Sequence, residues 1–254
     1  MYTQDSQASS IPNTPAGCLG EVKTITLTVD PTATVTVPAD QEKCNGAQSD
    51  PIAFTGTIDG TTYNWSNDNP AIGLVANGTG DHIPAFMLIN TTNIPAVAHI
   101  RVTPNTPAGC PGETKTITIT VNSTASVTVP ANQVKCNGAE TDPIQFTGTV
   151  AGTTYTWTND NTAIGLAAAG AGDHIPTFTL TNTTNVPLTA NITVIPNTPA
   201  GCPGEAKIFT ITVNPNTNLQ LTSGAGTANQ ALCVNTDLTV ITYQTINATN
   251  ASVS

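Results

Sequence analysis

The chain has 254 residues, of which only 9% are charged, and its 16 acidic and 6 basic residues give a net charge of −10. This acidic balance predicts no nucleic-acid partner, which would need a basic face, and it disfavours anionic membrane surfaces. No apolar run approaches the roughly 18–20 residues of a membrane helix, so no membrane insertion is expected. Residues 1–10 are polar and unlike a signal peptide, so we expect the export signal elsewhere in a parent protein.

An internal repeat of 92 residues organises the chain. Cys18, Cys110 and Cys202 stand in the phrases TPAGCLG, TPAGCPG and TPAGCPG, each 92 residues from the last, and Cys44 and Cys136 open two CNGA phrases at the same spacing. This unit is too long for a solenoid repeat of about 20–50 residues and fits a two-sheet sandwich domain of about 100 residues. We therefore predict a C-terminal domain fragment (1–30), two complete domains (31–122 and 123–214) and the N-terminal fragment of a diverged domain (215–254).

Strand-like alternation of apolar and polar residues runs through the chain, and Thr, Val and Ile favour strands. The strand 24–29 ends the first fragment. In the second complete copy, strands are predicted in chain order at 126–130, 143–149, 153–158, 176–181, 188–195 and 208–214. Turns rich in Gly, Pro and Asn separate them. This pattern predicts an all-β fold of tandem immunoglobulin-like, antiparallel β-sandwich domains, and the short joints between domains predict an extended, semi-rigid rod.

Two aromatic pairs repeat at the third strand. Tyr63 and Trp65, like Tyr155 and Trp157, are two residues apart, which places both rings on one face of the strand. An immunoglobulin-like sandwich buries a Trp at this place, so we predict that the four rings lie in the cores. A sugar-binding platform would need several exposed rings, and aromatic residues make up only 4% of the chain.

The six cysteines indicate disulfides, because the close CxxC pairs of a zinc site are missing. Two pairings preserve the repeat: Cys44–Cys110 with Cys136–Cys202 inside the domains, or Cys18–Cys44, Cys110–Cys136 and Cys202–Cys233 across the junctions. We favour the first, which leaves Cys18 and Cys233 unpaired in this chain. If the two strands between Cys110 and Cys136 run on through successive domains, they separate these cysteines by tens of ångströms, and a bridge needs Cα atoms within about 7 Å.

Two polar phrases also repeat. The pairs Asp81-His82 and Asp173-His174 lack the further ligands or nucleophile of a metal or catalytic site, so we predict a loop Asp that caps nearby amides. The Asn-Asp-Asn triplets at 67–69 and 159–161 are typical of turns and leave room for weak calcium binding.

Other candidates carry less weight. His99 is replaced by Asn191 in the next copy, so we expect it to lie outside the shared design. The Asn-x-Ser/Thr matches at Asn64, Asn90, Asn182 and Asn191 are interpreted as by-products of a Thr- and Asn-rich composition. Motifs of serine hydrolases, zinc proteases and phosphate-binding loops are missing. We expect no cofactor and no enzymatic activity.

The phrases CNGA, IQFTGT, GTTYTWTNDN, TPAGCPG and FTITVNP together resemble the PKD-like repeats of large Bacteroidetes surface adhesins. This resemblance covers residues 31–214 and the flanking 17–29. PKD domains proper carry a WDFGDG-type motif where this chain has TWTNDN and NWSNDN, so the resemblance is to the PKD-like type. It implies export by the type IX secretion system, an outer cell-surface location and, for some such proteins, gliding motility.

The predicted function is structural: stalk or spacer repeats of a bacterial surface adhesin or filament. Its partners would be neighbouring repeats, other copies in a filament, and a surface or glycan ligand that the sequence does not identify. The alternative is an immunoglobulin-like accessory module that recognises glycans for a secreted polysaccharide-active protein.

Overall fold

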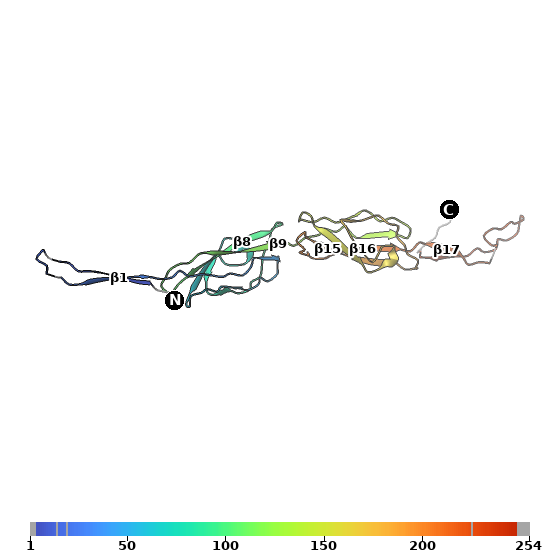
Figure 1. The fold of residues 1–254 in the computed structure, drawn as a ribbon. Coiled ribbons are helices and arrows are strands. Elements are labelled where there is room, and N and C mark those ends of the chain that lie inside the picture. The colour runs from blue at the N-terminus through green and yellow to red at the C-terminus, as the bar shows by residue number, and fades with distance from the viewer. Residues whose placement is uncertain (1–3, 14, 19, 225, 248–254) are drawn as a thin grey trace. The chain divides into compact units, whose positions relative to one another are not determined.

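A computed structural model describes residues 4–13, 15–18, 20–224 and 226–247. They form strands, loops and two single-turn 3₁₀ helices (Figure 1). The chain divides into two compact units, Met1–Ser123 and Thr124–Ser254, each holding one complete repeat. The predicted border after residue 122 differs from this division by one residue, and the finer division into four pieces stays a prediction. Within the described residues, no helix is long and apolar enough to span a membrane.

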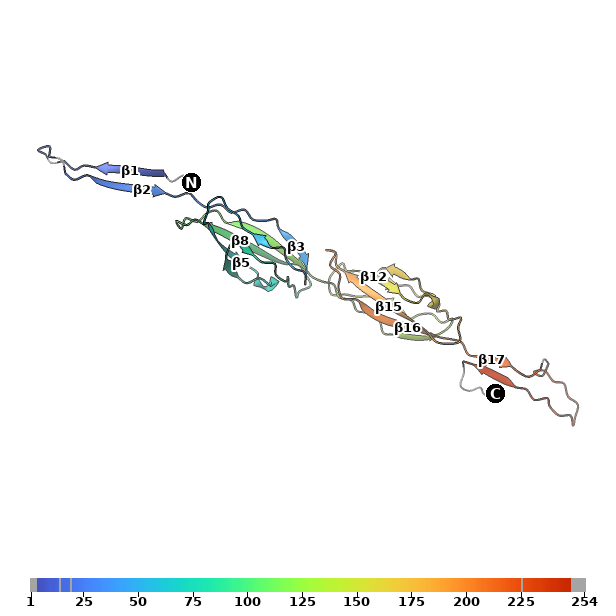
Figure 2. The ribbon, with the colours of Figure 1, turned by 90° about the horizontal axis from the view of Figure 1, so that it is seen from below.

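The complete repeat of the first unit contains seven strands and one 3₁₀ helix. They are β3 (Gln41–Cys44), β4 (Ile52–Ala53), β5 (Thr62–Asn67), η1 (Pro70–Ile72), β6 (Asn77–Thr79), β7 (His82–Ile83), β8 (Ala96–Asn105) and β9 (Lys115–Asn122). Five of the strands form a sheet in the order β3-β9-β8-β5-β6, with β8 next to β5 (Figure 2). The short pair β4–β7 belongs to the opposite layer.

The apolar alternation decides which side chains fill the core between these layers. In β8, Ala98, Ile100 and Val102 are fully buried and the residues between them are exposed. Ile52 and Phe54 of the opposite layer are buried in the same cluster. Full burial of an apolar side chain of this size contributes about 1.5–3 kcal/mol, so the alternating face holds the small layer against the sheet.

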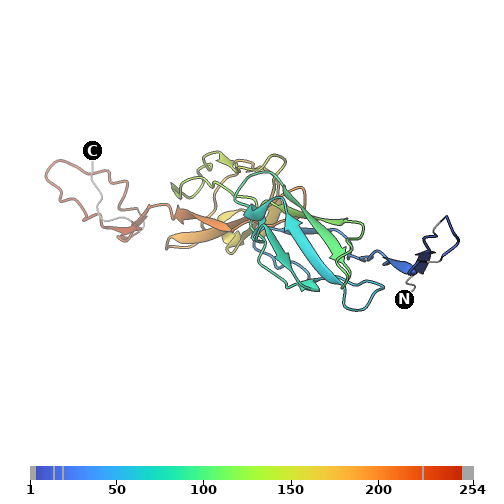
Figure 3. The ribbon, with the colours of Figure 1, turned by 90° about the vertical axis from the view of Figure 1, so that its left-hand side faces the viewer.

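The second unit contains the same architecture. Its elements are β10 (Gln133–Cys136), β11 (Ile144–Gln145), β12 (Thr154–Asn159), η2 (Thr162–Ile164), β13 (Ala169–Ala171), β14 (His174–Ile175), β15 (Leu188–Asn197) and β16 (Lys207–Asn214). The sheet order is β10-β16-β15-β12-β13, and β11 pairs with β14. Figure 3 shows this arrangement in the first unit, where strands β5, β8 and β9, coloured cyan to green, lie side by side. The predicted all-β sandwich is confirmed.

Three of the predicted strands are reduced: the one at 143–149 keeps only Ile144–Gln145 as β11, and two others keep a single bridge each. The predicted strand at 126–130 makes a single bridge, Thr128 with Thr147, and the segment 176–181 likewise makes a single bridge, at Thr179. Both segments have a proline at one end, which cannot donate to a ladder. These segments therefore cover the core as extended chain rather than as full strands.

The edge strands β3 and β10 were not predicted, and they correct the purely antiparallel topology. β10 pairs in parallel with the last strand of its domain, with Gln133 opposite Ile211 and Cys136 opposite Asn214. Its four residues show no apolar alternation: buried Gln133 exchanges hydrogen bonds with the backbone of Asp142 at 2.9 and 3.3 Å. A polar side chain satisfied by backbone groups gives no hydrophobic signal in the sequence.

Two hairpins flank the complete repeats. β1 (Gln4–Ser10) pairs with β2 (Lys23–Val29), and β17 (Asn218–Leu221) pairs with β18 (Tyr243–Ile246), both antiparallel. The predicted strand at 24–29 is therefore present as β2, but its partner is the polar segment β1, which the sequence did not indicate. Every residue of β2 is exposed, so this hairpin has no buried face of its own.

Candidate functional site

The repeated aromatic pairs lie in the cores. Tyr63 and Trp65 of β5 are 6% and 8% exposed, and Tyr155 and Trp157 of β12 are 5% and 7% exposed. The ring of Phe54 lies 5.8 Å from that of Tyr63, centroid to centroid. Burial raises the pKa of the Tyr63 hydroxyl. These rings are packing residues and do not form an exposed platform on which a sugar could stack.

A glycine on the neighbouring strand makes room for each indole. Gly78 of β6 is the pairing partner of Trp65, and a Cβ at Gly78 would lie 2.3 Å from Cζ2 of the Trp65 ring. Gly170 has the same relation to Trp157, also at 2.3 Å. No non-bonded atom can approach a carbon atom that closely, so a side chain at this place would displace the ring. The glycine stands at the same place in both copies. This repeat was the sequence signal for the close contact between the glycine and the indole, which the aromatic pairs alone do not reveal.

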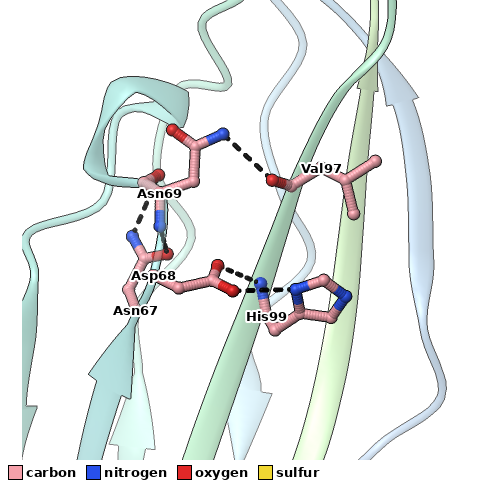
Figure 4. Close-up of polar contacts among 5 residues, drawn as sticks. All are labelled: Asn67, Asp68, Asn69, Val97 and His99. Carbon is pink, nitrogen blue, oxygen red and sulfur yellow. Dashed lines mark hydrogen bonds and ion pairs between the residues drawn. The ribbon is translucent and has the colours of Figure 1, made fainter.

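The Asn-Asp-Asn triplet forms a turn that ties three parts of the domain together (Figure 4). The side chain of Asn67 is buried, donates to the carbonyl of Leu74 at 2.9 Å and accepts from the backbone N–H of Asn69 at 3.0 Å. Asn69 in turn donates from Nδ2 to the carbonyl of Val97 on β8 at 2.9 Å. The turn predicted for this triplet is present, and its amides secure η1 to the sheet.

Asp68, the middle residue, holds strand β8 with both carboxylate oxygens (Figure 4). It accepts from the backbone N–H of His99 at 2.7 Å and from the Nδ1 of the same residue at 2.8 Å. These hydrogen bonds from His99, the backbone one first, lower the pKa of the Asp68 carboxyl. In the second domain, Asp160 accepts from the backbone N–H and from Nδ2 of Asn191, both at 2.7 Å.

The expectation that His99 lies outside the shared design is therefore wrong. His99 and Asn191 present a side-chain nitrogen at the same place, and each donates to the Asp of the triplet. Both carboxylate oxygens of this Asp accept a hydrogen bond, and weak calcium binding at the triplet stays a prediction. Within the described parts of the chain, no group of three or more His, Cys, Asp or Glu residues could hold a metal ion.

The Asp-His phrases form exposed contacts. Nδ1 of His82 lies 2.7 Å from Oδ1 of Asp81, and the two side chains are 58% and 83% exposed. This hydrogen bond lowers the pKa of the Asp81 carboxyl. The carbonyl of Asp81 accepts from the backbone N–H of Phe54 at 2.8 Å, so the backbone of the phrase also closes the loop. Asp173 and His174 repeat the 2.7 Å contact in the second domain.

The asparagine of the NTTN phrase is a buried hydrogen-bond centre that sequence reasoning missed. Asn90 is 6% exposed; its Nδ2 donates to the carbonyls of Ile94 and Val121 at 2.8 and 2.7 Å. Its Oδ1 accepts from the backbone N–H and the hydroxyl of Thr92 at 2.8 and 2.7 Å. Asn182 repeats all four bonds in the second domain. The matches at these two residues therefore have a structural cause, and the identical NTTN phrase in both copies was the available signal.

The structure corrects the predicted disulfide pairing. Cys44 ends β3 opposite Asn122, the last residue of β9, while Cys110 lies in the turn before β9 begins at Lys115. Seven residues of extended strand separate these two levels by about 23 Å, well beyond the reach of a disulfide. The same geometry separates Cys136 from Cys202 in the second domain.

The state of each cysteine agrees with this geometry. Cys110, Cys136 and Cys233 are free thiols, so neither the within-domain pairs nor the Cys110–Cys136 and Cys202–Cys233 pairs are formed. Cys44 and Cys202 each take part in a disulfide. Cys18 is exposed, and its predicted unpaired state stays a prediction.

Comparisons with solved structures give distant likenesses. The fibronectin(III)-like modules of Clostridium thermocellum CbhA match with 13% identity and a TM-score of 0.29, over 72% of this chain and 95% of that one. Drosophila N-cadherin EC1-4 matches with 12% identity and a TM-score of 0.43, over 77% of this chain and 52% of that one. The I67–I69 fragment of titin matches with 10% identity and a TM-score of 0.42, over 74% and 66%.

The sequence comparisons decide the family. No curated protein matches the chain. The family profile of the PKD-like domain matches twice, at residues 37–125 and 133–217, which is more than half of the chain. These two stretches contain the five-stranded sheets, the Asn-Asp-Asn turns and the buried asparagine centres described above. The chain therefore belongs to the PKD-like domain family and carries two tandem copies of its domain.

Proposed function

We propose that the two PKD-like domains are spacer repeats in the stalk of a bacterial cell-surface adhesin. The observation that supports this most is that the polar residues repeated in both copies form hydrogen bonds within their own domain. Asn67, Asp68 and Asn90, with their counterparts in the second domain, make their side-chain hydrogen bonds within their own domain, and most of these bonds are to backbone groups. These shared polar residues thus hold the fold, and in the Asp81-His82 and Asp173-His174 pairs, which both copies expose, the two side chains bond to each other.

A spacer must keep its length under load. An interior in which every buried polar group has a hydrogen-bond partner helps it to do so. Among the described residues, no buried side-chain nitrogen or oxygen lacks a hydrogen-bond partner. Buried polar groups that are fully paired favour a single packing and resist local opening. Length is then set by the number of copies, and two near-identical domains in tandem are what this requires.

An extracellular place for the stalk is supported by its cysteines. Cys44 and Cys202 are disulfide-bonded, and such bonds persist in oxidising compartments such as the periplasm and the cell surface. Export through the type IX system to the outer surface is part of the proposal and follows from the resemblance of the repeat phrases.

The proposal is tested by varying the number of repeats. Chains with one, two and four complete repeats would be compared by small-angle X-ray scattering. In each domain the longest described strand, Ala96–Asn105 or Leu188–Asn197, spans about 30 Å. The maximum dimension should therefore rise by a constant step of at least this size for each added repeat. A dimension that stays level as repeats are added would contradict a spacer.

A glycan array separates the spacer from a glycan-binding module. The chain as it stands, with Cys44 and Cys202 kept disulfide-bonded, would be applied to bacterial and plant polysaccharides beside a known lectin. We expect no specific signal, since the repeated aromatic rings are buried. Saturable binding that is lost when a surface residue is changed, with the fold unchanged, would favour the binding module instead.

A further inference from the structure

Each PKD-like domain carries its two cysteines at opposite ends of its sheet. Cys136 lies opposite Asn214, where the last strand ends and the chain leaves the domain, so we call its place the exit end. Cys202 lies in the turn before that strand. At Gly204 of this turn, a Cβ would be 1.7 Å from the carbonyl oxygen of Ala125, so the turn packs against the residues by which the chain enters. We call this place the entry end.

The first domain has the same arrangement. Cys44, at the exit end, lies opposite Asn122. Cys110 belongs to the entry-end turn, in which a Cβ at Gly112 would be 1.8 Å from the carbonyl oxygen of Ala33. A domain of this type therefore presents one cysteine toward each end, and neither can reach the other.

The two domains differ in the state of these cysteines. One exit-end cysteine, Cys44, and one entry-end cysteine, Cys202, are disulfide-bonded. Their counterparts Cys136 and Cys110 are free thiols. The exit-end position and the entry-end position can thus each form a disulfide in this fold. Each position also occurs once as a free thiol, at Cys136 and at Cys110.

The two thiols are accessible. Cys136 is exposed and lines a hollow of about 420 Å³ together with Asn185, Pro187, Asn214, Pro215, Thr217 and Asn247. Cys110 is partly exposed, whereas Cys202 at the same place in the other domain is fully buried. The hollow therefore gives a turn that carries an entry-end cysteine room to reach Cys136. The side chain of Cys110 remains partly accessible to a partner cysteine.

We propose that Cys136 and Cys110 are half-cystine positions for further repeats of the same type: an exit-end thiol bonds to an entry-end thiol of another PKD-like domain. The inference rests on the proposed spacer function, and it makes the spacer a covalently stapled series of domains. The bond forms by oxidation of two thiols, with loss of two protons and two electrons. In a glutathione buffer these reduce one glutathione disulfide to two molecules of glutathione.

A second copy of this chain supplies the complementary cysteine for the test. In a Cys18→Ser/Cys233→Ser background, Cys110→Ser leaves only the exit-end thiol and Cys136→Ser leaves only the entry-end thiol. The parent should form a ladder of covalent multimers in glutathione redox buffer. Each single variant should stay monomeric, and an equal mixture of the two should give dimers and nothing larger on a non-reducing gel.

Mass spectrometry identifies the bond. One variant of the mixture is labelled with ¹⁵N, so that a Cys110–Cys136 peptide pair with one heavy and one light half comes only from two different chains. That mixed pair is the expected result. Multimers of a single variant, a mixture that stays monomeric with its thiols still free, or a bond between the two cysteines of one chain would each overturn the proposal.

This experiment is independent of the test of the proposed function. It reads out a covalent bond between copies, whereas the spacer was tested by length and by ligand binding. Failure to form mixed dimers would overturn the proposed disulfides between repeats and would not affect the proposed spacer function. A binding module with the same thiols would still form the dimers.

Discussion

Removal of the buried amide at Asn90 is the sharpest test of how these domains are held together. In the Asn90→Ala variant, the carbonyl of fully buried Val121 loses its side-chain donor, and Thr92 loses two bonds to Oδ1. A buried group left without its partner costs about 1–3 kcal/mol, and a net hydrogen bond contributes about 0.5–1.5 kcal/mol. Thr92 is exposed and can bond to water in part, so we expect a loss of about 2–4 kcal/mol.

The chain contains its own reporter for this measurement. It has two tryptophans, Trp65 and Trp157, one in each core. In a Trp157→Phe background, fluorescence follows the first domain alone. A small domain has a guanidinium m-value of about 2–4 kcal/mol per M, so the midpoint should fall by about 1 M.

Asn182→Ala provides the matched control. It removes the same four bonds from the second domain and should leave the Trp65 transition in place. The reasoning would be refuted if Asn90→Ala moved the midpoint by less than about 0.2 M, or if Asn182→Ala moved it equally.

Three further predictions follow from the sites described above. Gly78→Ala should push the Trp65 ring toward solvent, destabilise the first domain by about 1–3 kcal/mol and shift its fluorescence to the red. Asp68→Ala should lower stability at neutral pH. The folded pKa of Asp68 is depressed, so its contribution is present above the unfolded pKa of about 3.9 and is lost as pH falls through the folded pKa. Cys136 should react with iodoacetamide in the native protein, and Cys44 only after reduction.

Each of these has an outcome that contradicts it. A Cβ at Gly224 would meet no atom within 4 Å, so Gly224→Ala should be neutral; an equal loss there would remove the steric explanation for Gly78. A constant difference between wild type and Asp68→Ala from about pH 7 to about pH 2 would show that the carboxylate bonds do not matter. Native labelling of Cys44, mapped by peptide mass, would show that its disulfide is not formed.

Much of the fold follows from the repeat and from the alternation of apolar residues. The strands that become β12, β15 and β16 were predicted because every second residue is apolar, and burial then selects that face. β10 could not be predicted in this way, because Gln133 faces inward and is satisfied by backbone bonds. Its parallel pairing with β16 joins the first and last strands of the domain, and local pattern carries no information about such distant partners.

The sites were harder to predict than the strands. Cysteine spacing limited the set of repeat-preserving pairs, but it did not show that Cys44 and Cys110 lie at opposite ends of one sheet. The exchange of His99 for Asn191 suggests that this position lies outside the shared design, although the two side chains donate to equivalent carboxylates, Asp68 and Asp160. Comparison by residue identity misses such an exchange, because a hydrogen bond needs a nitrogen in the right place and not a particular residue.

The parallel pairing of the first and last strands has a mechanical consequence. In the first domain, Gln41 lies opposite Ile119 and Cys44 opposite Asn122, so the edge strand runs in the same direction as the strand by which the chain leaves. A pull on the two ends of the domain draws these neighbours past each other along their length. The hydrogen bonds between them then carry the load together and must break as a group, whereas in a hairpin pulled open from its end they would break one after another. We therefore expect tension along such a domain to be opposed first by these hydrogen bonds acting together.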